Sequence, residues 1–242
     1  MNRWNMLKPK LLKQLLPKPL KAEQVEVSMV ASMHDESAVP TPWLLDVCLR
    51  AAEEARTVKM DDVSQRIKDG PDYPGIWPGE HYKLLAGFVK YLKPEVVIEI
   101  GTFRGIGTLA LAKYLPETGM IATFDPVPWD NVSTTALSKS DFSDKFVQFN
   151  DDLAEMHAVE KHRSLLRSAD IFFIDAAKDG VMEHRFIKNL KAIGLKANTV
   201  VIFDDIRLWN MLDVWRTIDF PKLDLTSFGH WSGTGVVQWN PS

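Results

Sequence analysis

Residues 96–108 read VVIEIGTFRGIGT, and this stretch decides the fold of the chain. Its first residues form a nearly uninterrupted apolar run, which predicts a strand covered on both faces of a sheet. Gly101, Gly105 and Gly107 follow within seven residues and permit a sharp turn and close approach of a ligand to the backbone. The apolar residues after this loop can continue as a helix. The pattern predicts the first strand, loop and helix of a nucleotide-binding α/β domain.

The glycine spacing narrows the class of ligand. A dinucleotide-binding loop has the pattern G-x-G-x-x-G, which would require a glycine where this chain has Phe103. The observed pattern is E-x-G-x-x-x-G-x-G and begins at Glu99. This spacing argues against a nicotinamide-dependent dehydrogenase.

The later sequence alternates apolar runs with amphipathic segments. Strands are expected at residues 120–124, 146–149, 170–175 and 199–205, with a helix after most of them. Residues 223–228 and 236–239 predict two more strands, and the short turn between them requires an antiparallel pair. We therefore predict an α/β fold: a doubly wound, mostly parallel seven-stranded sheet with an antiparallel last strand.

Length and composition predict one domain. The 242 residues fit an N-terminal extension (1–40) and a single domain (41–242), with a helical cap (41–93) before the sheet core (94–242). The formal net charge of −3 gives no basic field for nucleic acid, so no nucleic-acid partner is expected. Cys48 is the single cysteine, and no apolar run reaches the roughly 20 residues of a membrane span. These features predict a cytoplasmic protein.

The first 22 residues carry six Lys or Arg side chains and no acidic residue. One interpretation is a basic arm that makes weak contact with an anionic membrane surface or an acidic partner. The other is a terminus that is poorly ordered or only packs on the surface of the domain. The sequence leaves both interpretations open.

Aspartates follow several predicted strands, where parallel sheets bind their ligands. Asp125 lies about 20 residues beyond the glycine loop, where a carboxylate can accept two hydrogen bonds from ribose hydroxyls, or can simply start a turn. Asp151 and Asp152 follow the third strand and could bind an adenine amino group or cap the next helix.

Three further aspartates end the fourth and fifth strands: Asp175, Asp204 and Asp205. Carboxylates side by side repel one another unless a cation or hydrogen-bond donors lie between them. Oxygen ligands of this kind suit Mg²⁺, so these residues are candidate metal ligands. The alternative is helix capping, because each precedes a helix.

Together these motifs resemble the class I S-adenosylmethionine (SAM)-dependent methyltransferases, and within them the small O-methyltransferases typified by catechol O-methyltransferase. The resemblance covers roughly residues 75–239. Glu99, Gly101 and Gly105 match the acidic residue and glycines of the family's first motif. The resemblance implies SAM as the cofactor, bound by a set of loop and strand-end residues: Glu99, Gly101, Thr102, Gly105, Gly107, Asp125, Asp151, Asp152 and Asp175.

Residues 173–179 read FIDAAKD and are similar to the family's fourth-strand motif. The resemblance implies that Asp175 binds a metal ion and that Lys178 is the general base. Asp204 and Asp205 resemble the second metal motif, which is usually Asp-Asn, so Asp205 adds a negative charge to the implied site of Mg²⁺ or another divalent cation. As a base, Lys178 would need a pKa lowered by burial and a nearby cation; a lysine facing solvent is the alternative.

The predicted function is SAM-dependent methyl transfer to a hydroxyl of a small molecule, with or without a divalent metal ion. A metal-independent O- or N-methyltransferase and a non-catalytic cofactor-binding module are the alternatives. The sequence identifies neither the methyl acceptor nor whether the chain forms a homo-oligomer.

Overall fold

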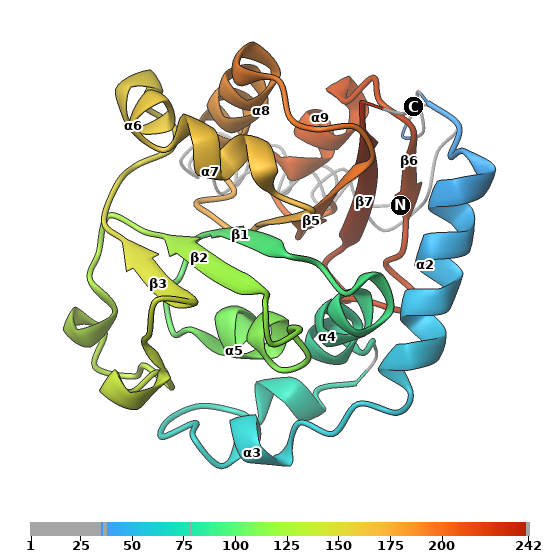
Figure 1. Ribbon diagram of the computed structural model, residues 1–242. Helices are drawn as coiled ribbons and strands as arrows, with labels where there is room; N and C mark the ends of the chain where they lie inside the picture. The colour runs from blue at the N-terminus through green and yellow to red at the C-terminus, as the bar shows by residue number, and fades with distance from the viewer. Residues whose placement is uncertain (1–34, 36–37, 78, 241–242) are drawn as a thin grey trace, which may run out of the picture.

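The computed structural model describes residues 35, 38–77 and 79–240, which form one seven-stranded sheet with helices on both faces (Figure 1). The basic segment of residues 1–22 lies outside the described residues, and so does Pro78. Predictions about that segment therefore stay predictions.

The sheet has the order β3-β2-β1-β4-β5-β7-β6. Its strands are β1 (Val96–Ile100), β2 (Met120–Phe124), β3 (Phe146–Phe149), β4 (Ile171–Ile174), β5 (Thr199–Asp204), β6 (Lys222–Asp224) and β7 (Thr234–Trp239). The first five pair in parallel, and β7 pairs antiparallel with both β5 and β6. The predicted fold is thus confirmed.

Strand β6 differs most from its prediction, because it covers Lys222–Asp224 instead of residues 223–228. β6 ends at Asp224 because the Asp224 carboxylate accepts a hydrogen bond from the backbone N–H of Thr226 at 2.8 Å, which turns the chain. The N–H groups of Phe228 and Gly229 then donate to the carbonyl oxygen of Leu225 at 2.8 Å, which closes a second turn. These local bonds replace the sheet ladder that the apolar residues after Asp224 suggest.

Two layers of helices enclose the sheet (Figure 1). One face is covered by α4 (His81–Leu92) and α5 (Ile106–Ala112), with the short α3 (Asp61–Ser64) beside them. The other face is covered by α6 (Met156–Lys161), α7 (Arg163–Ser168), α8 (Val181–Ile193) and α9 (Met211–Thr217). The helix α2 (Pro42–Ala55) packs against α4 at the β6 edge. The described residues also form three 3₁₀ turns: η3 (Tyr73–Gly75), η4 (Trp129–Asn131) and η5 (Lys139–Asp141).

The two layers explain why the strands read as continuous apolar runs. In β4, Phe173 packs into the core beneath α4 and α5, whereas Phe172 and Ile174 pack into the core on the side of α6–α9. Each of these side chains is fully or almost fully buried. Since burying one such side chain stabilises a fold by about 1.5–3 kcal/mol, both faces of the sheet favour apolar residues.

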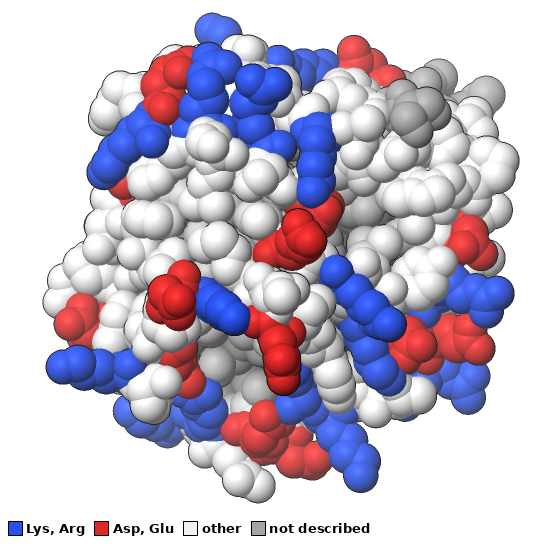
Figure 2. Space-filling view, in the orientation of Figure 1, with Lys and Arg blue, Asp and Glu red and all other residues white. Residues whose placement is uncertain are grey.

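The outer surface is mixed in charge. Figure 2 shows Lys and Arg side chains interspersed with Asp and Glu over the face seen in Figure 1. Among the described residues, no helix combines the length and the apolar character needed to cross a membrane.

The carboxyl ends of β1 and β4 approach each other closely at Gly101. Its φ of 101° lies in the region that favours glycine. A Cβ at this position would lie 1.9 Å from the carbonyl oxygen of Asp175. Backbone packing therefore requires a glycine at this position, whether or not a ligand also approaches it.

We expect Gly101→Ala to lower the free energy of unfolding by more than about 3 kcal/mol, because the new methyl group collides with backbone that cannot move aside. Gly194→Ala is the matched control, since Gly194 also has a positive φ, 68°, but nothing lies within 4 Å of a Cβ there. The control should lose only about 1 kcal/mol. Urea denaturation of both variants measures the difference, and equal losses would contradict the packing argument.

Candidate active site

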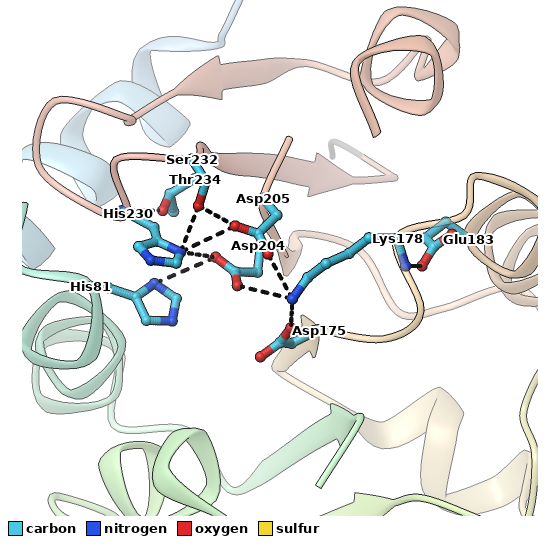
Figure 3. A network of polar contacts seen from close by, with 9 residues as sticks. All are labelled: His81, Asp175, Lys178, Glu183, Asp204, Asp205, His230, Ser232 and Thr234. Atoms are coloured by element: carbon cyan, nitrogen blue, oxygen red, sulfur yellow. Dashed lines mark hydrogen bonds and ion pairs between the residues drawn. The ribbon is translucent and has the colours of Figure 1, made fainter. Parts of the chain in front are cut away.

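The fourth and fifth strands bring three carboxylates together around one lysine (Figure 3). Asp175 follows β4, Asp204 ends β5, and Asp205 comes next in the chain. The Nζ atom of Lys178 lies 2.7 Å from Asp175 Oδ1, 2.6 Å from Asp205 Oδ2 and 3.8 Å from Asp204 Oδ2. The structure thus brings together all three predicted metal ligands and the predicted base.

A buried carboxylate holds the loop that carries this lysine. Glu183, in the first turn of α8, accepts hydrogen bonds from the backbone N–H of Lys178 at 2.7 Å and of Gly180 at 2.9 Å. Asp179 caps the same helix by accepting from the N–H groups of Val181 and Met182. These bonds keep Lys178 in a left-handed conformation, with φ of 59°, from which its side chain reaches back to the carboxylates.

The electrostatics of the cluster favour a charged lysine. Burial lowers the pKa of Lys178, but the attraction of Asp175, Asp205 and Asp204 outweighs it, so the pKa is raised above its ordinary value. This direction is opposite to the one that a general base requires. The lysine therefore acts as an internal cation among the carboxylates.

The pKa values of two of the carboxylates are shifted in opposite directions. Burial, together with repulsion from Asp204, raises the pKa of Asp175 to about 7. Burial also raises the pKa of Asp205, but its hydrogen bond to His230 and the charge of Lys178 reverse the shift, so the pKa lies well below the ordinary range. Asp175 can therefore exchange a proton near neutral pH.

Two histidines lie on the other side of Asp204. His230, in the loop between β6 and β7, places Nδ1 3.3 Å from Asp204 Oδ1, 3.2 Å from Asp205 Oδ1 and 2.9 Å from the Ser232 hydroxyl, which itself bonds Asp205. His81, the first residue of α4, places Nδ1 3.6 Å from Asp204 Oδ1. Burial lowers the pKa of His81, whereas the two carboxylates, working against burial, raise the pKa of His230 to about 10.

The two histidines on this side of the cluster and the buried Glu183 were not predicted from the sequence. His81 stands at a helix start and His230 in a hairpin loop, and neither belongs to the motifs after β4 and β5. The one available signal was the polar, glycine-containing stretch 230–235, which we interpreted only as a turn.

Two cavities meet at the cluster. The first, of about 290 Å³, is lined by the glycine loop, the charged cluster and several aromatic side chains: Tyr73, Ile76, Gly79, His81, Tyr82, Glu99, Gly101, Thr102, Phe103, Arg104, Gly105, Ile106, Gly107, Asp175, Lys178, Asp204, Gly229, His230 and Trp231. The second, of about 280 Å³, includes Asp125, Asp151 and Asp152 in its lining. Both are lined by Gly101, Phe103 and Asp175, so the two spaces adjoin.

The predicted residues of the glycine loop line the first cavity, and two of them, Glu99 and Thr102, also make hydrogen bonds to other side chains of the protein. Glu99 is buried and accepts a hydrogen bond from Thr108, and burial raises its pKa to about 8. The Thr102 hydroxyl lies 2.7 Å from that of Thr123 and accepts a bond from Gln148 at 3.1 Å. These bonds fix the loop beside the cavity.

The predicted aspartates of the second cavity are also oriented by neighbours. Asp125 accepts hydrogen bonds from the backbone N–H of Phe103 at 3.0 Å and of Val127 at 2.9 Å, and the first of these ties the glycine loop to β2. Asp152 accepts from the N–H of Ala154 at 2.8 Å, which forms a turn before α6. The bond does not cap that helix, which begins at Met156 after Glu155.

Asp151 pairs with Lys161 and His162, each at 2.8 Å. The hydrogen bonds from these two residues lower the pKa of its carboxyl. Like Asp125 and Asp152, Asp151 keeps its place in the lining of the second cavity.

We expect Lys178→Met to lower the free energy of unfolding by about 3 kcal/mol, because it leaves three neighbouring carboxylates without their cation. Adding Asp205→Asn to that variant should restore part of the loss, since it removes one of the repelling charges. Lys188→Met, at an exposed position of α8, is the control and should change stability by less than about 0.5 kcal/mol. Chemical denaturation at pH 7 measures all three. A Lys178→Met protein as stable as the control would contradict the role of the lysine as internal cation.

Comparison with known proteins places this geometry in a family. The sequence matches the O-methyltransferase family over residues 77–214, more than half of the chain. No curated protein matches it in a sequence search.

Several solved structures share the fold. The O-methyltransferase TomG from Streptomyces achromogenes, solved in complex with SAM, is 17% identical, with a TM-score of 0.54 over 79% of this chain and 96% of that one. A putative caffeoyl-CoA O-methyltransferase from Staphylococcus aureus is 14% identical, with a TM-score of 0.54 over 82% and 98%. The Podospora anserina methyltransferase PaMTH1, bound to S-adenosylhomocysteine, is 18% identical, with a TM-score of 0.53 over 86% and 92%.

Proposed function

We propose that this chain, which belongs to the O-methyltransferase family, transfers a methyl group from SAM to a hydroxyl of a small molecule. The observation that carries the proposal is the pair of adjoining cavities, one beside Asp125 and one between the glycine loop and the charged cluster. Two adjoining spaces of this size would accommodate a cofactor whose nucleoside lies in one and whose reactive end lies in the other, next to the acceptor. TomG, which shares the fold, was solved with SAM bound.

The roles follow from position. Asp125 is placed to bind the ribose hydroxyls, and Asp151 and Asp152 line the cavity where the adenine would lie. The glycine loop, with Glu99 beneath it, would hold the methionine part. Most of the catalysis in such a transfer is alignment of the acceptor oxygen, the methyl carbon and the sulfur.

The acceptor hydroxyl must also lose a proton. Asp175 lies where the two cavities meet, so its carboxylate is placed to accept that proton. Lys178, held charged at 2.7 Å from this carboxylate, is placed to orient it and to stabilise the developing negative charge on the acceptor oxygen. In this proposal the lysine is an electrostatic and positioning group, and the base is the aspartate.

A divalent ion at Asp175, Asp204 and Asp205 stays a prediction. The ligand oxygens lie within 4.8 Å of one another and are of the kind Mg²⁺ prefers. However, the ammonium group of Lys178 already lies between two of them, so an ion there would have to displace it. No step of the proposed reaction needs that ion. This arrangement favours a reaction without an ion between these three carboxylates.

Two measurements separate the candidates. The first incubates the protein with SAM and a panel of catechol-type, phenolic and sugar hydroxyl acceptors. An enzyme forms S-adenosylhomocysteine with at least one acceptor, whereas a non-catalytic cofactor-binding module forms none. Repeating the assay with the chelator EDTA distinguishes the metal-independent reaction, which keeps its rate, from a reaction that needs an ion.

We expect Asp125→Ala to weaken SAM binding at least about 10-fold, because hydrogen bonds to a charged group contribute roughly 1.5–3 kcal/mol. Asp130→Ala, an exposed aspartate on the same connection, is the matched control and should bind as the parent does. Calorimetric titration with SAM and with S-adenosylhomocysteine gives both affinities. If the folded parent protein binds neither, the proposed function is wrong; if Asp125→Ala binds as tightly as the control, only the ribose role fails.

A further inference from the structure

Asp204 divides the charged cluster into two halves. It ends β5, is 3% exposed, and directs its two oxygens to different partners (Figure 3). Oδ2 faces Lys178, while Oδ1 faces Nδ1 of His81 and Nδ1 of His230. His81 belongs to α4, Asp204 to β5 and His230 to the loop before β7. All three residues line the first cavity.

His81 presents a buried nitrogen that lies near a carboxylate but, among the described residues, makes no hydrogen bond. The residue is only 8% exposed, and among the described residues its Nδ1 has no hydrogen-bond partner. An unsatisfied buried polar atom costs about 1–3 kcal/mol, so such an atom aimed at a carboxylate calls for an explanation. A bound ion between the histidine and the carboxylate would supply the missing partner.

The spacing of the donor atoms fits an ion. In a tetrahedral zinc site with bonds of about 2.0–2.1 Å, neighbouring donor atoms lie about 3.4 Å apart. Here Asp204 Oδ1 lies 3.6 Å from His81 Nδ1 and 3.3 Å from His230 Nδ1. Hydrogen bonds of this type are usually near 2.9 Å, so the spacing is wide for direct bonds. All three donor atoms lie within 4.8 Å of one another.

We propose that His81, Asp204 and His230 form a binding site for a divalent transition-metal ion of the Zn²⁺ or Mn²⁺ type, with an open coordination position toward the first cavity. Imidazole nitrogens select such ions over Mg²⁺, which prefers oxygen ligands. Two histidines and one carboxylate with an open position are also the ligand set of catalytic zinc sites. This site is distinct from the all-carboxylate set that the family resemblance implies, and it leaves Lys178 in place.

Binding has identifiable competitors. His230 would have to give up its contacts to Asp205 at 3.2 Å and to Ser232 at 2.9 Å, because the ion takes the place of the proton on Nδ1. The charge of Lys178, 3.8 Å from Asp204 Oδ2, opposes a second cation, although Asp175 and Asp205 offset it.

The role of the ion rests on the proposed function, because an acceptor hydroxyl in the first cavity could fill the open position and become more acidic there. Binding of the ion does not rest on it. Metal binding is measured without SAM or acceptor, so its failure would leave the proposed methyl transfer untouched, and failure of SAM binding would leave the metal site untouched.

The test is a titration of the full-length, chelator-treated protein with Co²⁺, which reports its coordination through visible absorption. We expect one equivalent to give the intense bands of a four- or five-coordinate ion, with stoichiometric Zn²⁺ displacing it and excess Mg²⁺ leaving it bound. His230→Ala and His81→Asn should each weaken Co²⁺ binding at least about 100-fold, since loss even of an outer-shell partner costs 10–100-fold. His184→Ala, which removes an exposed histidine, is the matched control and should bind as the parent does.

Asp175→Asn separates this site from the all-carboxylate one. Asp175 is not among the three ligands, so the variant should keep the Co²⁺ bands. Circular dichroism establishes that each variant is folded; His230 is only partly buried, so its variant carries the test if His81→Asn fails to fold. The proposal is overturned if the folded parent gives no Co²⁺ bands, if His230→Ala leaves them unchanged, or if they depend on Asp175 instead.

Discussion

The arrangement of the site depends on one buried charge interaction, that of the Lys178 ammonium with the carboxylates of Asp175 and Asp205. A parallel sheet brings the ends of β4 and β5 side by side, so the aspartates that follow these strands cannot avoid one another. Buried like charges at this distance are unfavourable without a cation. The loop between β4 and α8 supplies that cation, and the buried Glu183 carboxylate keeps the loop in the conformation that this requires.

This constraint also explains what could be predicted from the sequence. The strands β1 to β5 were predictable because each is a mostly apolar run, buried throughout or in part, that ends in a turn or an acidic residue. The close pairing of β6 and β7 followed from their short connection. The proximity of Asp175, Asp204 and Asp205 was also predictable, because strand order alone brings their positions to one edge of the sheet. The length of β6 was not, because the turn after Asp224 depends on a single side-chain hydrogen bond.

The rest of the site depends on contacts between segments far apart in the chain. His81 and His230 are separated by most of the domain and meet only because β7 is inserted between β5 and β6, which returns its preceding loop to the end of β5. The direction of the Lys178 pKa shift could not be predicted from the sequence either. Burial and a neighbouring cation would lower it, but the number of carboxylates within reach decides the sign, and that number is known only from the folded arrangement.

Formal charge connects the two halves of the cluster. When all three carboxylates are ionised, the ammonium of Lys178 leaves two negative charges, and Asp205 accounts for one of them. In the metal-free protein the second positive charge comes from His230, whose pKa is raised beside Asp204 and Asp205. A divalent ion on the Oδ1 side of Asp204 would take the place of that charge, while Lys178 keeps its position on the Oδ2 side. On this argument the additional aspartate and the two histidines belong to one arrangement: the internal ammonium occupies the space between the carboxylates, and the metal ion binds on the opposite side of Asp204, where imidazole nitrogens are available and the cavity is open.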